Sequence, residues 1–105
     1  MDSDSDHVTV AFGRALRALR RQRRLTQESF ARQCDSHRNY VGALERGETS
    51  PTLRVQARLA DGLGISLTQL AQEIDHQLMQ MRPELPPPGD GAIAADEPDP
   101  PRRDG

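Results

Sequence analysis

The sequence has few of the residues that build β-rich or disulfide-linked folds. Its 105 residues include no tryptophan, no lysine, one tyrosine, two phenylalanines and one cysteine. Because aromatic side chains favour strands, their scarcity favours helices and a core of aliphatic residues. The single cysteine, Cys34, excludes an internal disulfide and cannot by itself make a zinc site.

Signals for membranes, secretion and catalysis are also missing. No apolar run approaches the ~20 residues that span a membrane, and the acidic start, residues 1–6, is unlike a secretion signal. We therefore expect a cytoplasmic chain with no membrane contact. His7, His37 and His76 show no metal-ligand spacing, and there is neither a phosphate-binding glycine loop nor a nucleophile elbow. We expect no catalytic residue, metal or cofactor, and hence no enzyme.

The charge is unevenly placed along the chain. The formal net charge is −2, but residues 7–82 hold twelve arginines and seven acidic residues. Residues 1–6 carry three aspartates, and residues 83–105 carry six acidic residues against two arginines. A basic body between acidic ends suits a polyanionic partner, although a solvated charged surface would look the same.

Apolar residues recur at helical spacing through the basic body. The pattern predicts five helices, over residues 8–23, 27–33, 37–46, 53–62 and 66–82. Before them lies a polar leader, residues 1–7, and after them a proline-rich acidic tail, residues 83–105, and we expect both to be disordered. The sequence thus predicts an all-α, compact five-helix domain over residues 8–82.

Capping residues mark the ends of these helices. Thr26 and Thr52 are suited to begin helices, and Gly47 to end one. Asp35 falls in the short link between the second and third helices, where aspartate tolerates a left-handed conformation. A link of about three residues forces a steep crossing, which is the helix-turn-helix spacing.

The residues of this region resemble the Xre family, the Cro and phage-repressor type of helix-turn-helix, over roughly residues 10–76. The resemblance is carried by LTQESFA (25–31), HRNYV (37–41), LERG (44–47) and LADGLGIS (59–66). It implies a lambda-repressor-like fold and a DNA-binding regulator. This sequence departs from the family at Asp35 and Gly62, where Gly and Ala are usual, and at Ser36 and Gln56, where apolar residues are common. These departures predict a slightly looser core.

The resemblance also implies which positions contact double-stranded DNA. They are Gln27, His37, Arg38, Asn39, Tyr40, Gly42, Ala43, Arg46, Thr49 and Arg54. Arg38 can bind O6 and N7 of guanine together, and Asn39 can bind adenine. Arg38 could instead contact only phosphate, and Asn39 could serve the helix start.

The remaining contact positions have weaker chemical arguments. Gln27 is expected to reach the phosphate backbone, or else to be plain surface. Tyr40 either packs against the body or reaches a phosphate. Gly42 and Ala43 offer few hydrogen bonds, although Ala43 could touch a thymine methyl. Arg46, Thr49 and Arg54 are candidate phosphate contacts or ordinary surface.

Two further sets of residues have structural roles in this interpretation. The resemblance matches Arg20 and Glu45 to a partly buried ion pair between the first and third helices. An apolar stripe on the fifth helix continues beyond what a small core needs, which predicts a homodimer interface. Its residues are Leu67, Leu70, Ile74, Leu78 and Met81. The core can use the first three, whereas Leu78 and Met81 have no obvious partner in so small a body. A frayed helix end with a few exposed apolar residues would give the same pattern.

The sequence therefore predicts a sequence-specific DNA-binding transcriptional regulator, with the third helix in the major groove of a duplex bound by two copies. An alternative is an antitoxin or other interaction protein whose tail binds an unidentified partner protein while the body binds its own promoter. The tail is long enough for this, but it lacks the apolar anchors of a tight-binding segment.

Overall fold

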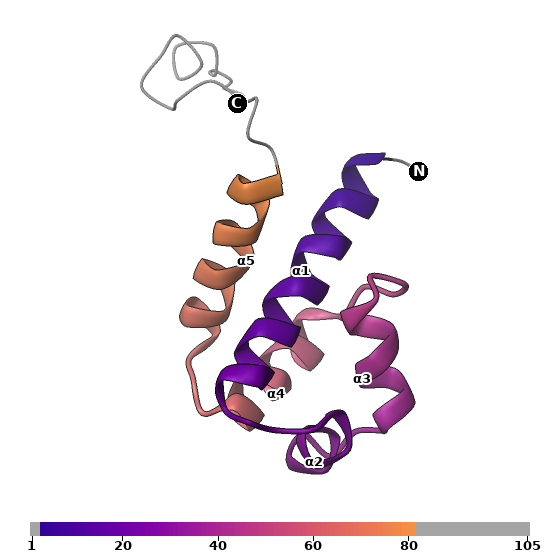
Figure 1. Ribbon diagram of the computed structural model, residues 1–105, viewed down its shortest axis with the longest axis vertical. Helices are drawn as coiled ribbons and strands as arrows, with labels where there is room; N and C mark the ends of the chain where they lie inside the picture. Colours follow the sequence, from indigo (N-terminus) through magenta and orange to yellow (C-terminus); the bar gives the residue numbers. More distant parts are fainter. Residues whose placement is uncertain (1–2, 82–105) are drawn as a thin grey trace, which may run out of the picture.

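All five predicted helices are present. The computed structural model describes residues 3–81, with side chains from residue 7 onward. The helices are α1 (Ser3–Gln22), α2 (Gln27–Gln33), α3 (Arg38–Glu45), α4 (Leu53–Leu63) and α5 (Leu67–Met81). Residues 3–81 contain no strand, so this part of the chain is all-α (Figure 1). The predicted tail, residues 83–105, lies outside the described residues.

α1 is longer than the sequence pattern predicted. It begins at Ser3 rather than near Val8, so most of the predicted leader is helical. Apolar periodicity marks only the part of a helix that faces a core, whereas serine and aspartate are the residues favoured at a helix start. The added turns matter for packing, because α1 runs antiparallel beside α5 over much of its length (Figure 1).

The core takes side chains from all five helices, with α1 packed on α3 and α5, α2 on α3 and α4, and α4 on α5. It is aliphatic apart from two phenylalanines and Cys34, as the composition requires. The largest fully buried side chains are Phe30, Leu16, Leu44, Leu59, Leu70, Val41 and Cys34. The predicted looser core is not found at Gly62. A Cβ there would lie 2.5 Å from Sγ of Cys34, so glycine makes room for the thiol.

Among residues 3–81, two non-glycine residues have a left-handed backbone. Asp35, in the turn between α2 and α3, has a φ of 56°, as the turn chemistry of the sequence predicted. Arg24, just before α2, has a φ of 58°, which no pattern indicated. Single residues in this region cost about 1 kcal/mol unless they are glycine, asparagine or aspartate, so Arg24 adds local strain at the entry to α2.

Gly13 allows α1 to approach the end of α3 closely. A Cβ at this position would lie 2.5 Å from the carbonyl oxygen of Leu44 and 2.7 Å from that of Glu45. Both atoms are backbone, so they cannot rotate away as a side-chain end would. Gly13 is therefore required for the contact that sets the position of α3 against α1.

We predict that Gly13→Ala destabilises the domain by about 1–3 kcal/mol, as overpacking does, although alanine is the better helix former. The matched control is Gly42→Ala in α3, where a Cβ would meet only the side-chain ends of Arg46 and Gln27. That control should leave stability unchanged or raise it by up to ~1 kcal/mol. Urea unfolding followed by circular dichroism measures both, and equal effects would contradict the assignment.

Candidate nucleic-acid interface

The beginnings of α2 and α3 open onto one face of the domain. A shallow hollow between the two helices is lined by Gln27, Arg38, Asn39, Gly42 and Arg46. A second hollow adjoins it and shares Gln27 and Arg38 with it. The sequence reasoning placed all five residues of the first hollow in the contact set, and the fold brings them together.

Side-chain caps fix where these two helices start. The Thr26 hydroxyl accepts a hydrogen bond from the backbone N–H of Ser29 at 3.0 Å, and Ser29 Oγ accepts from the N–H of Thr26 at 3.0 Å. At α3, Nδ1 of His37 accepts from the backbone N–H of Asn39 at 3.1 Å. His37 is thus the N-cap of α3, a role that sequence reasoning did not assign to it.

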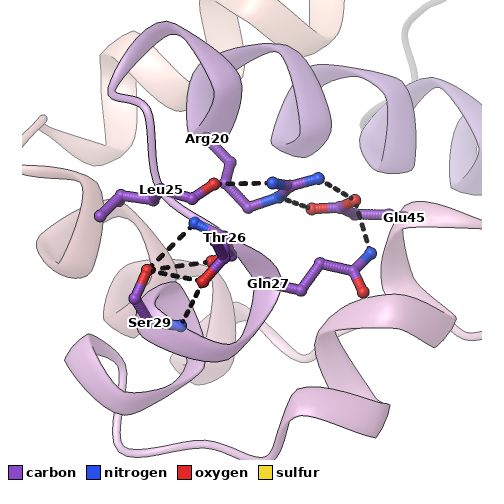
Figure 2. Close-up of polar contacts among 6 residues, drawn as sticks. All are labelled: Arg20, Leu25, Thr26, Gln27, Ser29 and Glu45. Carbon is purple, nitrogen blue, oxygen red and sulfur yellow. Dashed lines mark hydrogen bonds and ion pairs between the residues drawn. The ribbon is translucent and has the colours of Figure 1, made fainter.

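A buried carboxylate ties three helices together behind this face (Figure 2). Glu45 accepts from Nε and Nη2 of Arg20 at 2.6 and 3.0 Å. Arg20 also donates from Nη1 to the carbonyl of Leu25 at 2.7 Å, and Gln27 donates from Nε2 to Glu45 at 3.0 Å. The Glu45 side chain is 2% exposed and that of Arg20 is 10% exposed. The ion pair that the resemblance implied is therefore present, and the neutral amide of Gln27 hydrogen-bonds to its carboxylate.

The predicted contact residues differ in how exposed they are. Exposed to solvent are His37, Arg38, Asn39, Arg46 and Arg54, and partly buried are Gln27, Tyr40, Ala43 and Thr49. Gly42 is buried, and the side-chain ends of Arg46 and Gln27 lie 3.0 and 3.6 Å from where a Cβ on it would be. Tyr40 packs against the core, which favours the packing role left open above. Thr49 and Arg54 follow α3 in the chain and do not line the two hollows.

Arg46 has a partner that sequence reasoning missed. Its Nε and Nη2 donate to the two carboxylate oxygens of Glu48 at 2.7 and 3.2 Å. The hydrogen bond with Glu48 raises the pKa of Arg46, and the same bond lowers the pKa of the Glu48 carboxyl. Only the short spacing across Gly47 could have suggested the pair from the sequence.

The predicted dimer stripe needs correction. Leu70 is 0% exposed and Ile74 packs against the core, because α1 covers this side of α5. Leu78 and Met81 are partly buried, so they are not left bare by the body as the stripe argument assumed. The large apolar side chains of α5 that are most exposed are Leu67, at 36%, and Met79, at 54%.

The described residues offer little for metal or thiol chemistry. Within residues 3–81 no group of histidine, cysteine and acidic side chains is arranged to hold a metal ion. Burial raises the pKa of the Cys34 thiol to about 11, so it stays protonated and poorly nucleophilic at neutral pH. Among the helices in this range, none combines the length and hydropathy that a membrane crossing needs.

Comparison with known proteins identifies the family to which the domain carrying this face belongs. The profile of a family described as a helix-turn-helix domain matches residues 11–72, more than half of the chain. The chain belongs to this helix-turn-helix family. Its relatives include the control protein C.MunI of a Mycoplasma species, which is 35% identical over 71 residues, covering 67% of this chain and 96% of that protein.

Two solved structures share this fold. The restriction-modification controller protein C.AhdI from Aeromonas hydrophila has 39% sequence identity with this chain. Its crystal structure superposes with a TM-score of 0.58, and the match covers 59% of this chain and 94% of C.AhdI. The regulator ClgR from Corynebacterium glutamicum shares the fold at a TM-score of 0.69, with 23% identity over 73% of this chain and 82% of that one. This helix-turn-helix protein is a DNA-binding transcription regulator of the Cro and repressor type, a family of regulators and not a class of enzymes.

We predict that Arg20→Met destabilises the domain by about 3–5 kcal/mol, because it leaves the buried Glu45 carboxylate without its partner. Arg20→Met combined with Glu45→Met should recover most of that loss, since a well-packed apolar pair is often as stable as a buried ion pair. Denaturant unfolding of the two variants measures this difference.

The control for that experiment is the exposed pair of Arg32 and Glu28, whose side chains are 72% and 67% exposed. Arg32→Ala should change stability by no more than about 0.5 kcal/mol. If Arg20→Met cost no more than this control, the Arg20–Glu45 pair would not hold the helices as described.

Proposed function

We propose that this regulator binds double-stranded DNA as a homodimer, with α3 in the major groove, and controls transcription of restriction-modification genes. The main support for DNA binding is that Arg38 and Asn39, in the first turn of α3, are exposed to solvent. Both side chains line the same hollow as Gln27. The names of the relatives, control protein and restriction-modification controller, support the choice of target genes.

The first turn of α3 has the chemistry that base reading requires. The guanidinium of Arg38 matches O6 and N7 of guanine, and the amide of Asn39 matches N6 and N7 of adenine. The backbone N–H of Asn39 is already bonded to His37, so the start of the helix is capped without the Asn39 side chain. The side chain is then free for a base.

Gln27 has a different place in the proposal. Its Nε2 is held by Glu45, and its Oε1 lies 3.6 Å from the position of a Cβ on Gly42. The side chain therefore spans from the buried carboxylate to the face of α3. We infer that it supports the geometry of that face and has one free N–H for a phosphate, in keeping with the expectation from the sequence.

We infer a homodimer because one helix contacts too few base pairs to define a selective site. One α3 covers a few base pairs, whereas two copies on half-sites about 34–36 Å apart read twice as many. The surface that we assign to the partner copy is the strip of α5 that carries Leu67, Ala71 and Leu78, because the first two are exposed and Leu78 is only partly buried. The antitoxin alternative depends on the tail, which lies outside the described residues.

We predict that Arg38→Ala weakens binding to the preferred site by about 1–3 kcal/mol and relaxes the choice of one base pair. Gln27→Ala should weaken binding evenly across sequences. Fluorescence anisotropy on a panel of single base-pair variants of the preferred site separates the two patterns. Equal weakening by Arg38→Ala on every sequence would make Arg38 a phosphate contact and contradict its assignment.

We further predict that Leu67→Asp with Leu78→Asp converts the protein into a folded monomer with weakened binding to a palindromic site. Charge on an apolar contact surface disfavours association, and neither side chain is fully buried in the domain. Sedimentation velocity measures the mass, and circular dichroism checks the fold. Wild-type protein that stays monomeric at high micromolar concentration would contradict the homodimer.

A further inference from the structure

Arg46 and Glu48 form a forked pair at the end of α3. Nε and Nη2 of Arg46 donate to Oε2 and Oε1 of Glu48. Gly47, between them, has a φ of 75°, a left-handed turn that glycine adopts freely and that brings residue 48 back beside residue 46. The two side chains are 60% and 56% exposed, so the pair lies in water and is not part of the core.

The free end of this guanidinium lies across the face of α3. Glu48 occupies the edge formed by Nε and Nη2, which leaves the edge formed by Nη1 and Nη2. Nη1 lies 3.0 Å from where a Cβ on Gly42 would be. Arg46 therefore fills the space that the missing side chain of Gly42 leaves, in the hollow that Arg38 and Asn39 also line.

A phosphate contact fits this arrangement poorly. The Glu48 carboxylate is 2.7 Å from Arg46, so it cancels the charge of the guanidinium and would repel a phosphate brought to the same place. A base edge carries no net charge and meets no such repulsion. Guanine presents two neighbouring acceptors, O6 and N7, that match the free edge of a guanidinium fork.

The carboxylate also restricts the arginine side chain. A free arginine loses side-chain conformational entropy when it is immobilised at an interface, and this loss weakens binding. Two hydrogen bonds to Glu48 fix the plane of the guanidinium before any ligand arrives. The guanidinium of Arg46 is therefore a preoriented pair of hydrogen-bond donors and not a flexible positive charge.

We propose that Arg46 reads a guanine through its Nη1–Nη2 edge and that Glu48 is the positioning residue that aims it. This inference rests on the DNA-binding function proposed above and changes the role expected for Arg46 from a phosphate contact to a base contact. Gly42 completes the arrangement, because a larger residue there would push the guanidinium out of the hollow.

The test compares Arg46→Ala, Glu48→Ala and their double variant on single base-pair variants of the preferred site, at salt concentrations of roughly 50–200 mM. Arg46→Ala should reduce discrimination at one G·C pair by roughly 5- to 150-fold, the range that 1–3 kcal/mol corresponds to. Glu48→Ala should relax the same base pair and no other. The double variant should add little to either, because the two residues act as one unit.

Gly42→Ala provides an independent variant, because the added methyl group would meet only the side-chain ends of Arg46 and Gln27, with Nη1 of Arg46 nearest at 3.0 Å. It should relax the same G·C pair as Arg46→Ala. Replacing the guanine of that pair with 7-deazaguanine, which lacks the N7 acceptor, should weaken the wild type and leave Arg46→Ala nearly unaffected.

Glu28→Ala is the matched charge control, because Glu28 also lies beside the hollows and pairs only loosely with Arg32, at 3.5 Å. Its removal should strengthen binding evenly on all sequences. If Glu48→Ala did the same, or if Arg46→Ala weakened all sequences evenly and reduced the salt slope by about 1, Arg46 would be a phosphate contact and the inference overturned. A wild type without any site preference would contradict the proposed function as well.

Discussion

The buried carboxylate of Glu45 is the constraint on which the arrangement of the helices depends. A charge that is 2% exposed is costly to hold away from water unless every oxygen has a partner. Arg20 from α1 and Gln27 from α2 supply those partners. Since Glu45 is the last residue of α3, this one group determines how α1 and α2 sit against the helix that we assign to the major groove.

The same end of α3 is also held by backbone contact. Gly13 lets α1 lie against the carbonyls of Leu44 and Glu45, and the chain turns away immediately afterwards at Gly47. Polar and steric contacts therefore converge on one short stretch, while the other end of α3 is left open with His37 as its cap. A recognition helix anchored at its end and exposed at its start can present Arg38 and Asn39 in a fixed orientation. This is the preorganisation that selective binding needs.

Local signals in the sequence predicted most of the fold, and contacts distant in the sequence account for what it missed. Leucine spacing and the cap at Thr26 identify helices because both act within a few residues, and Asp35 adopts the left-handed turn its side chain tolerates. The close approach at Gly13 depends on carbonyls about thirty residues away, which no local pattern records. Leu78 and Met81 were expected to lack a partner in the body because the full length of α1, which packs beside α5, could not be seen from the sequence.

The same difference between local patterns and contacts distant in the sequence applies to the candidate site. The resemblance predicted the pairing of Arg20 with Glu45 and the residues that line the hollow. The pairing of Arg46 with Glu48 and the capping role of His37 became visible only in the folded structure.

Selection of binding sites from a random pool of duplex DNA with the purified full-length chain tests the central claim most directly. If α3 of each of two copies reads the major groove, the enriched sequences will contain an inverted repeat whose half-sites lie one helical turn apart, about 34–36 Å. Enrichment of no sequence, or of a single unrepeated half-site, would contradict the account of a dimeric major-groove reader.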